Sequence, residues 1–216
     1  MCIRDSFNCE SVQELEVIAR LAEVLNVTAR VCFRVNPDVN PHTHPYISTG
    51  EKGSKFGMDE YYLPEAFEKV FLNPRLEWLG FHFHVGSQIS NMNVFKQLAQ
   101  VASRIYTYWS KKGWQAKIIN LGGGLGIDYN SDEMPNFELY FSTLFQNLDC
   151  ADAEIHVELG RSLVARSCDL RTKVLFVKES GNKKIALVDA GMNDFLRPAL
   201  YGSKHRLCLD LSLIHI

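Results

Sequence analysis

The chain has 216 residues, of which 46% are hydrophobic and 22% are charged, and its formal net charge is −2. This composition is ordinary for a globular protein with a sizeable core. The balanced charge, with no long run of Lys and Arg, argues against a nucleic-acid or membrane-surface partner. No apolar stretch approaches the ~20 residues that a membrane-spanning helix needs.

The cysteines are scattered singly and none belongs to a CxxC pair; they are Cys2, Cys9, Cys32, Cys150, Cys168 and Cys208. This pattern predicts reduced thiols in a cytoplasmic protein rather than a disulfide framework. The first six residues contain no apolar core and do not form a signal peptide.

The first half of the chain alternates helical and strand patterns. Residues 11–25 place apolar side chains at helical spacing, and residues 29–35 form an apolar, β-branched run typical of a buried strand. A second helix is predicted over residues 63–71, and a second strand over residues 79–85.

The alternation continues in the next eighty residues. A long helix is predicted over residues 94–112, where Gly113 stands in the place of a C-terminal stop. A strand follows at residues 117–121, a helix at residues 137–148 and a strand at residues 154–159.

Repeated strand–helix units with short apolar strands predict a parallel α/β fold. Polar or glycine residues end three successive strands, at His84, at Gly122 to Gly124, and at Glu158 with Arg161. A (β/α)8 barrel keeps its active site at these strand ends, whereas an open doubly wound sheet uses one switch point. We therefore predict a partial TIM barrel.

The pattern changes after Arg161. Residues 170–179 and 184–189 read as two strands joined by the turn Ser180-Gly181-Asn182. This hairpin predicts a domain boundary near Ala165, with a partial barrel at residues 7–165 and the start of a β-rich domain at residues 166–206.

The two ends fit neither pattern. A typical barrel needs ~250 residues, and only about four barrel strands are predicted here. We expect a fragment lacking both ends, with non-native or unstructured residues at 1–6 and 207–216.

Alternating histidines end the strand in the segment GFHFHVGSQ at residues 80–88. His82 and His84 fall on one face because the side-chain period of a strand is two. His84 would present a flat imidazole at the barrel mouth for stacking on a ring, and Ser87 a hydroxyl for a phosphate. For His82, deeper in the strand, an ordinary core histidine is the better interpretation.

Three consecutive glycines follow the next strand in NLGGGLG, residues 120–126. Backbone N–H groups in such a loop can converge on a phosphate because no side chain blocks its approach. The segment is neither a Walker A motif nor a dinucleotide fingerprint. A tight turn is the ordinary interpretation.

The segment HVELGR at residues 156–161 places a carboxylate at a strand end, with Arg161 three residues beyond Glu158. A carboxylate facing a pyridine nitrogen would keep it protonated, and an arginine would bind a phosphate or carboxylate. An ordinary ion pair is about as plausible from this segment alone. In the loop-like segment after the hairpin, Arg197 and Tyr201 could converge on a polar ligand, but a surface arginine and a core tyrosine are the better interpretation from this segment alone.

Arg34 and Lys55 also bear on the prediction of a site. Arg34 ends a strand, so it would point into the barrel mouth or pair with a neighbouring acid. Lys55 is rejected as a Schiff-base lysine because its glycine-rich loop offers no apolar frame to lower its pKa.

Taken together, five ordered segments resemble the diaminopimelate decarboxylases: RVNPDVNPHTHPYISTGEKGSKFG, GFHFHVGSQ, NLGGGLGIDY, ELGR and DAGMNDFLRPALYG. The resemblance covers residues 7 to about 206. It implies a fold-type III, alanine racemase-like barrel that binds pyridoxal 5'-phosphate, a β domain and a homodimer. The implied reaction converts meso-2,6-diaminopimelate to L-lysine and carbon dioxide.

The resemblance also implies roles for individual residues. His84 would stack on the cofactor ring, and Glu158 would face its pyridine nitrogen. The substrate would contact Arg161, Arg197 and Tyr201. The remaining cofactor contacts would come from Ser87, Gly122, Gly123, Gly124, Leu159, Gly160 and Arg161.

Three departures from the family pattern stand out. Leu159 replaces the family's proline, which removes a backbone restraint but no chemical group. The motif with the Schiff-base lysine is missing, as is the C-terminal motif with the cysteine and acid that a partner subunit donates. We therefore expect this polypeptide to be inactive alone.

Three alternatives stay open. Related barrels decarboxylate ornithine, arginine or carboxynorspermidine. A metal-dependent hydrolase would use His82, His84, His156 and Glu158, although the triple glycine and the lack of an acidic ligand cluster count against it. A non-catalytic pyridoxal-phosphate-binding protein would lack the second domain.

Overall fold

The computed structural model describes residues 6–40, 55–129, 133–150 and 152–208. Its main sheet has five parallel strands in chain order: β1 (Phe7–Cys9), β2 (Ala29–Arg34), β3 (Leu76–His82), β4 (Ile118–Asn120) and β5 (Glu154–His156). A doubly wound sheet would reverse its order at a switch point. The sequential order confirms the predicted α/β fold and matches part of a (β/α)8 barrel.

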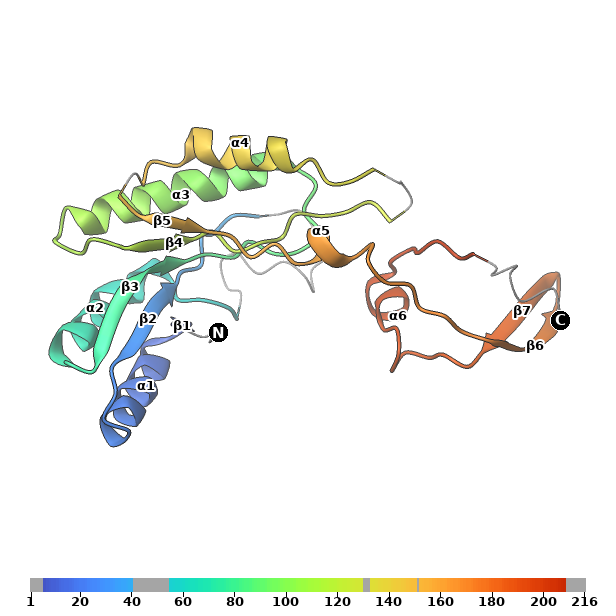
Figure 1. Ribbon diagram of the computed structural model, residues 1–216, viewed down its shortest axis with the longest axis horizontal. Helices are drawn as coiled ribbons and strands as arrows, with labels where there is room; N and C mark the ends of the chain where they lie inside the picture. The colour runs from blue at the N-terminus through green and yellow to red at the C-terminus, as the bar shows by residue number, and fades with distance from the viewer. Residues whose placement is uncertain (1–5, 41–54, 130–132, 151, 209–216) are drawn as a thin grey trace.

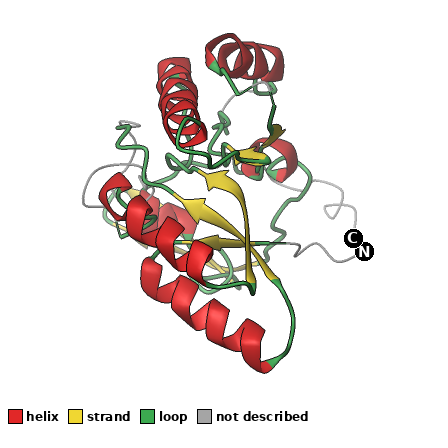
Figure 2. Cartoon of the chain, turned by 90° about the vertical axis from the view of Figure 1, so that its left-hand side faces the viewer, coloured by secondary structure: helices red, strands yellow, loops and turns green. Residues whose placement is uncertain are grey.

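Helices connect successive strands along the outside of the curved sheet (Figures 1 and 2). They are α1 (Val12–Val24), α2 (Leu63–Leu72), α3 (Met92–Ser110) and α4 (Phe137–Asn147), with a 3₁₀ turn, η2 (Glu60–Tyr62), before α2. Each parallel crossover returns the chain to the same edge of the sheet, so all the strands end on one side.

The first helix shows how local sequence sets these boundaries. The Ser11 side chain accepts a hydrogen bond from the Glu14 N–H at 3.1 Å, and the Glu14 carboxylate accepts one from the Glu10 N–H at 2.7 Å. These two bonds satisfy N–H groups that have no partner within the helix. Leu15 and Ala19 then bury one face of α1 against the sheet.

Aromatic packing fills the core between α2 and the sheet. The Phe67 ring lies edge-on to Phe33 at 4.9 Å and to Trp78 at 5.0 Å between ring centroids. Phe81 also meets Trp78 edge-on at 5.2 Å. Edge-to-face contacts of this kind stabilise a core beyond simple area burial.

Two predicted strands differ in their boundaries. The strand predicted at residues 79–85 occupies Leu76–His82, and the one predicted at residues 154–159 ends at His156. His84 and Glu158 therefore lie in loops just beyond the strands. The strand β1 was not predicted, because three residues are too few to display an alternating pattern.

The predicted hairpin is present as a separate two-stranded antiparallel sheet of β6 (Val174–Ser180) and β7 (Lys183–Val188). It lies away from the five-stranded sheet (Figure 1), beyond the short helices α5 (Arg161–Val164) and α6 (Arg197–Tyr201). All residues of both strands are exposed. The domain boundary near Ala165 stays a prediction.

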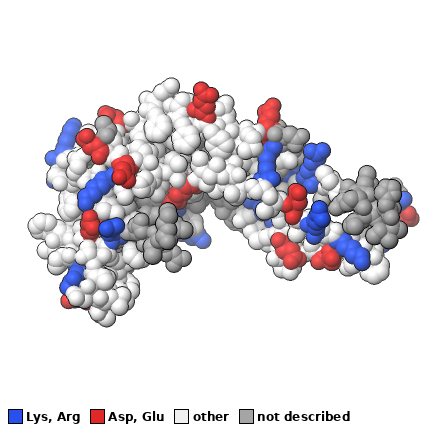
Figure 3. Space-filling model, viewed as in Figure 1, with Lys and Arg blue, Asp and Glu red and all other residues white. Residues whose placement is uncertain are grey.

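The terminal segments 1–5 and 209–216 lie outside the described residues. Among the residues that are described, no helix is long and apolar enough to cross a membrane. Acidic and basic side chains are interspersed on the face shown in Figure 3.

Candidate functional site

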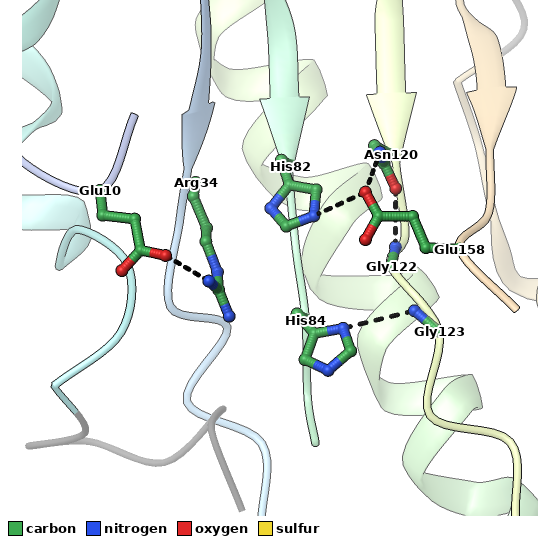
Figure 4. A network of polar contacts seen from close by, with 8 residues as sticks. All are labelled: Glu10, Arg34, His82, His84, Asn120, Gly122, Gly123 and Glu158. Atoms are coloured by element: carbon green, nitrogen blue, oxygen red, sulfur yellow. Dashed lines mark hydrogen bonds and ion pairs between the residues drawn. The ribbon is translucent and has the colours of Figure 1, made fainter. Parts of the chain in front are cut away.

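The loops that follow β3, β4 and β5 lie side by side at one edge of the sheet (Figure 4). Backbone hydrogen bonds tie them together: Phe83 N–H donates to Asn120 O at 2.8 Å, and Glu158 N–H donates to Gly122 O at 2.6 Å. The structure thus brings His84, the glycine loop and Glu158 together, as the strand-end argument predicts.

The three glycines allow these loops to pack closely. A Cβ added to Gly122 would lie 2.4 Å from Phe83 O, and one added to Gly123 would lie 2.0 Å from Glu158 O. At Gly124 it would lie 2.4 Å from Gly86 O. Gly122 and Gly124 also have φ values of +66° and +104°, which favour glycine. The loop therefore makes a tight turn, and the backbones of the neighbouring loops approach it closely.

Glu158 presents a carboxylate that is fixed on one side and open on the other. Its Oε1 accepts a hydrogen bond from Asn120 Nδ2 at 2.8 Å and lies 3.2 Å from His82 Nε2. These neighbours, His82 foremost, lower the pKa of Glu158 to about 2. The side chain keeps 47% of its surface exposed, so an ionised carboxylate faces outward at neutral pH.

The two histidines occupy different environments. His82 is only 4% exposed, in agreement with its interpretation as a core residue, and it serves to hold Glu158. His84 is half-buried, and its Nδ1 accepts a hydrogen bond from Gly123 N–H at 3.3 Å. Burial, followed by the nearby charge of Arg34, lowers the pKa of His84 to about 4. Its imidazole is therefore neutral at pH 7.

Arg34 takes the second of the two arrangements considered for it, since it pairs with a neighbouring acid. Its Nη1 donates to Glu10 Oε1 (Figure 4), and Glu10 Oε2 also accepts from Gly57 N–H at 3.3 Å. Sequence reasoning missed Glu10. Glu10 directly follows β1. Because that strand was not predicted, no sequence signal marked Glu10 as a strand-end residue.

Arg161 begins α5 beside the loop that follows β3. Its Nη1 donates to Gln88 Oε1 at 2.8 Å. The structure places Ser87 on that same loop, half-buried, and Leu159 and Gly160 on the turn before α5. Gln88 was also missed, although it closes the HVGSQ segment.

Arg197 and Tyr201 belong to α6 and gather with two residues that the sequence did not suggest. The Arg197 guanidinium lies 5.5 Å from the Tyr201 ring centroid and 5.6 Å from that of Tyr129. The His205 ring lies beside the Tyr129 ring in a tilted arrangement, with centroids 4.4 Å apart. Tyr129 follows the glycine loop, so this cluster connects the α6 segment to the barrel loops.

The cationic groups of Arg161 and Arg197 influence each other. Burial, and then the charge of Arg197, lower the pKa of Arg161. Burial also lowers the pKa of His205, followed by the charges of Arg197 and Arg161. Mutual repulsion of this kind makes the region attractive to an anion such as a carboxylate.

Lys55 is exposed and lies 5.0 Å from the Phe56 ring centroid, which agrees with its rejection as a buried reactive lysine. Within the described ranges, no three His, Cys, Asp or Glu side chains come together in a group that could hold a metal ion.

Comparison with known proteins identifies the family. Residues 3–165 match the family described as "Pyridoxal-dependent decarboxylase, pyridoxal binding domain". A diaminopimelate decarboxylase of Bacteroides thetaiotaomicron is 40% identical over 205 residues, which cover 93% of this chain and 53% of that protein. The chain spans about half the length of the curated relatives it matches.

Solved structures agree with this match. The diaminopimelate decarboxylase of Helicobacter pylori complexed with L-lysine superposes with a TM-score of 0.86 at 39% identity, covering 93% of this chain and 50% of that one. The enzyme from M. jannaschii in co-complex with L-lysine gives a TM-score of 0.79 at 35% identity, covering 93% and 48%. The chain therefore belongs to the pyridoxal-dependent decarboxylase family, and its residues 3–165 match the family's pyridoxal-binding domain.

Proposed function

We propose that this chain is part of an enzyme that converts meso-2,6-diaminopimelate to L-lysine and carbon dioxide with pyridoxal 5'-phosphate. The observation that carries the proposal is the convergence of an ionised carboxylate, a neutral imidazole and a guanidinium at one edge of the sheet. The names of the relatives, and the L-lysine in two solved structures, support the choice of substrate. We further propose that the whole enzyme is a cytoplasmic homodimer.

The donor set fits the cofactor. Glu158 has one carboxylate oxygen held by Asn120 and His82, and the open side of that carboxylate would accept a hydrogen bond from a protonated ring nitrogen. His84 is neutral, so its flat ring would stack on a cationic heterocycle without charge repulsion. When bound, pyridoxal phosphate supplies an electron sink for the electron pair that remains as carbon dioxide departs.

The loop residues would hold the phosphate. The Gly122 N–H already donates to Asn120 Oδ1 at 2.9 Å, and the Gly123 N–H donates to His84 Nδ1. Gly122 and Gly123 therefore shape the loop. Gly124 and Ser87 would contact the phosphate, together with the backbone of Leu159 and Gly160 and the side chain of Arg161.

Three residues would bind and orient the substrate. Arg161 and Arg197 present two cationic groups near the same loops, and Tyr201 lies beside Arg197. A substrate with two amino-acid ends carries a second carboxylate, which suits paired guanidinium groups better than the amine of ornithine does.

The proposal is tested in a full-length protein that contains this chain, made by restoring flanking sequence or grafting the flanks of the Helicobacter pylori enzyme. We expect L-lysine from meso-2,6-diaminopimelate, and little product from L-ornithine or L-arginine. Glu158→Gln should lower kcat on the order of 100-fold, because the charge opposite the ring nitrogen is lost. The matched control Glu154→Gln changes an exposed strand residue and should leave kcat unchanged. A protein that takes up the cofactor but releases no lysine would overturn the proposal.

A further inference from the structure

We propose that Gln88 is a positioning residue that sets the direction of the Arg161 guanidinium. The inference rests on the proposed function for the role of Arg161, and it adds a residue to which neither the family resemblance nor the comparisons assign a part. Three independent observations carry it: the backbone of Gln88, the contacts of its side chain, and the kind of partner it offers to Arg161.

The backbone of Gln88 is held in an unfavourable conformation. Its φ is +62°, and the other described non-glycine residues with positive φ are Asn26 and Asp38. Asn and Asp adopt this left-handed region several times more often than other residues, whereas Gln has no such preference. Conformations of this kind persist where surrounding contacts impose them, and they gather at functional sites.

The neighbouring backbone supplies part of that constraint. Ile89 N–H donates to Gly124 O at 2.9 Å, and Gly126 N–H donates to Ile89 O at 2.9 Å. These bonds form a parallel bridge between Ile89 and Leu125, so the loops after β3 and β4 are joined directly beside Gln88. The backbone position from which the Gln88 side chain extends is therefore fixed.

The Gln88 amide uses its donor and its acceptor in different ways. Its Nε2 donates to Ile127 O, and its Oε1 lies 3.4 Å from the Ile127 N–H and accepts from Arg161 Nη1 at 2.8 Å. A carbonyl can only accept and a guanidinium can only donate, so these partners determine which end of the amide is which. The acceptor oxygen thus points at Arg161.

The chemistry of this partner matters for binding. A carboxylate at this position would orient Arg161 and also neutralise it. An amide oxygen orients the guanidinium and leaves its charge uncompensated, and Arg161 forms no ion pair among the residues that the structure describes. Gln88 therefore holds a cation in place while keeping it available for an anionic group of the ligand.

The direct test follows the Arg161 side chain in the chain itself, by ¹⁵N-arginine NMR with the Arg161 signals assigned from Arg161→Lys. We expect Gln88→Leu to move the Arg161 Nη–Hη signals toward those of exposed arginines and to speed their exchange with water, because Nη1 loses its acceptor. The matched control Gln97→Leu, on the exposed face of α3, should leave those signals unchanged. Unchanged Arg161 signals in Gln88→Leu overturn the proposal.

Gln88→Glu gives a second readout and guards against loss of folding, because it preserves side-chain size. In the full-length holoenzyme it should raise the KM for meso-2,6-diaminopimelate at least tenfold and change kcat by less than threefold, since the Arg161 charge becomes neutralised. A merely structural role would instead lower the melting temperature and leave KM unmoved, which would overturn the proposal. If Arg161 responds to Gln88→Leu but the wild-type holoenzyme makes no lysine, the positioning role is supported and the proposed function alone fails.

Discussion

His84 illustrates how a single side chain acquires its chemistry from its surroundings. An imidazole at the surface titrates near pH 6.5. Burial first, and then the charge of Arg34, lower the pKa of His84 to about 4, so that the ring stays neutral across the physiological range. The sequence showed a histidine after a strand, but the loop after β4 and the Glu10-paired arginine on β2 are what produce this environment.

This lowered pKa predicts a pH dependence of stability. Between pH 6.5 and about 4 the unfolded chain binds a proton at residue 84 that the folded chain does not, so stability falls as the pH is lowered through this window. His84→Gln should reduce the loss of stability between pH 7 and pH 5 by about 2 kcal/mol, or roughly 4–8 °C in unfolding temperature. Thermal unfolding followed by circular dichroism at the two pH values measures it.

The matched control for this prediction is His156→Gln, at an exposed position on β5. It removes a histidine without removing a buried ring, so its pH dependence should follow the wild type. Glu158 does not disturb this comparison. Its pKa is lowered to about 2, so the stability that its ionised carboxylate adds is present above pH 4.5 and is lost only as the pH falls below that value. Equal pH dependence in His84→Gln and the wild type would contradict the prediction.

At the scale of elements, most helices could be placed from the sequence because their signals are local. Apolar spacing identified α1 to α4 to within two residues, and the structure shows Ser11 as the N-cap of α1. Strand ends were less certain, as β3 and β5 show. A strand ends where its neighbour stops offering hydrogen bonds, and that depends on residues far away in sequence.

The α1 cap provides a test at this scale. Ser11→Ala removes the acceptor for the Glu14 N–H, and we expect a loss of about 1 kcal/mol in the free energy of unfolding. Ser11→Asn keeps an acceptor at the N-cap and should stay within a few tenths of a kcal/mol of the wild type. Urea unfolding of the three proteins makes the comparison. A similar loss in both variants would show that something other than the cap is responsible.

At the scale of the whole molecule, the described residues form a sheet that does not close. β1 pairs only with β2, and β5 pairs only with β4, so both edges carry unpaired backbone groups. The β6–β7 hairpin exposes both of its faces, including Phe176 at 70%. Open edges and exposed apolar faces favour association with other chains.

The separation of the hairpin from the sheet leads to a prediction about truncation. None of residues 168–208 is buried, so a chain that ends at Ser167 should keep its unfolding temperature within about 4 °C of the full chain, which corresponds to roughly 1 kcal/mol. The shorter chain should also bind less of a hydrophobic dye. Differential scanning calorimetry with dye fluorescence tests both effects, and a drop of 10 °C would show that the second segment supports the first.

The sequence by itself determined the α/β class, the four main helices, the hairpin and the family resemblance, because spacing and motif order are written along the chain. Only the tertiary structure decided which side chains share the site. Glu10 with Arg34, and Gln88 with Arg161, are 24 and 73 residues apart. Such pairs form because parallel strands end at one edge of the sheet, and no local pattern records which loops will then be neighbours.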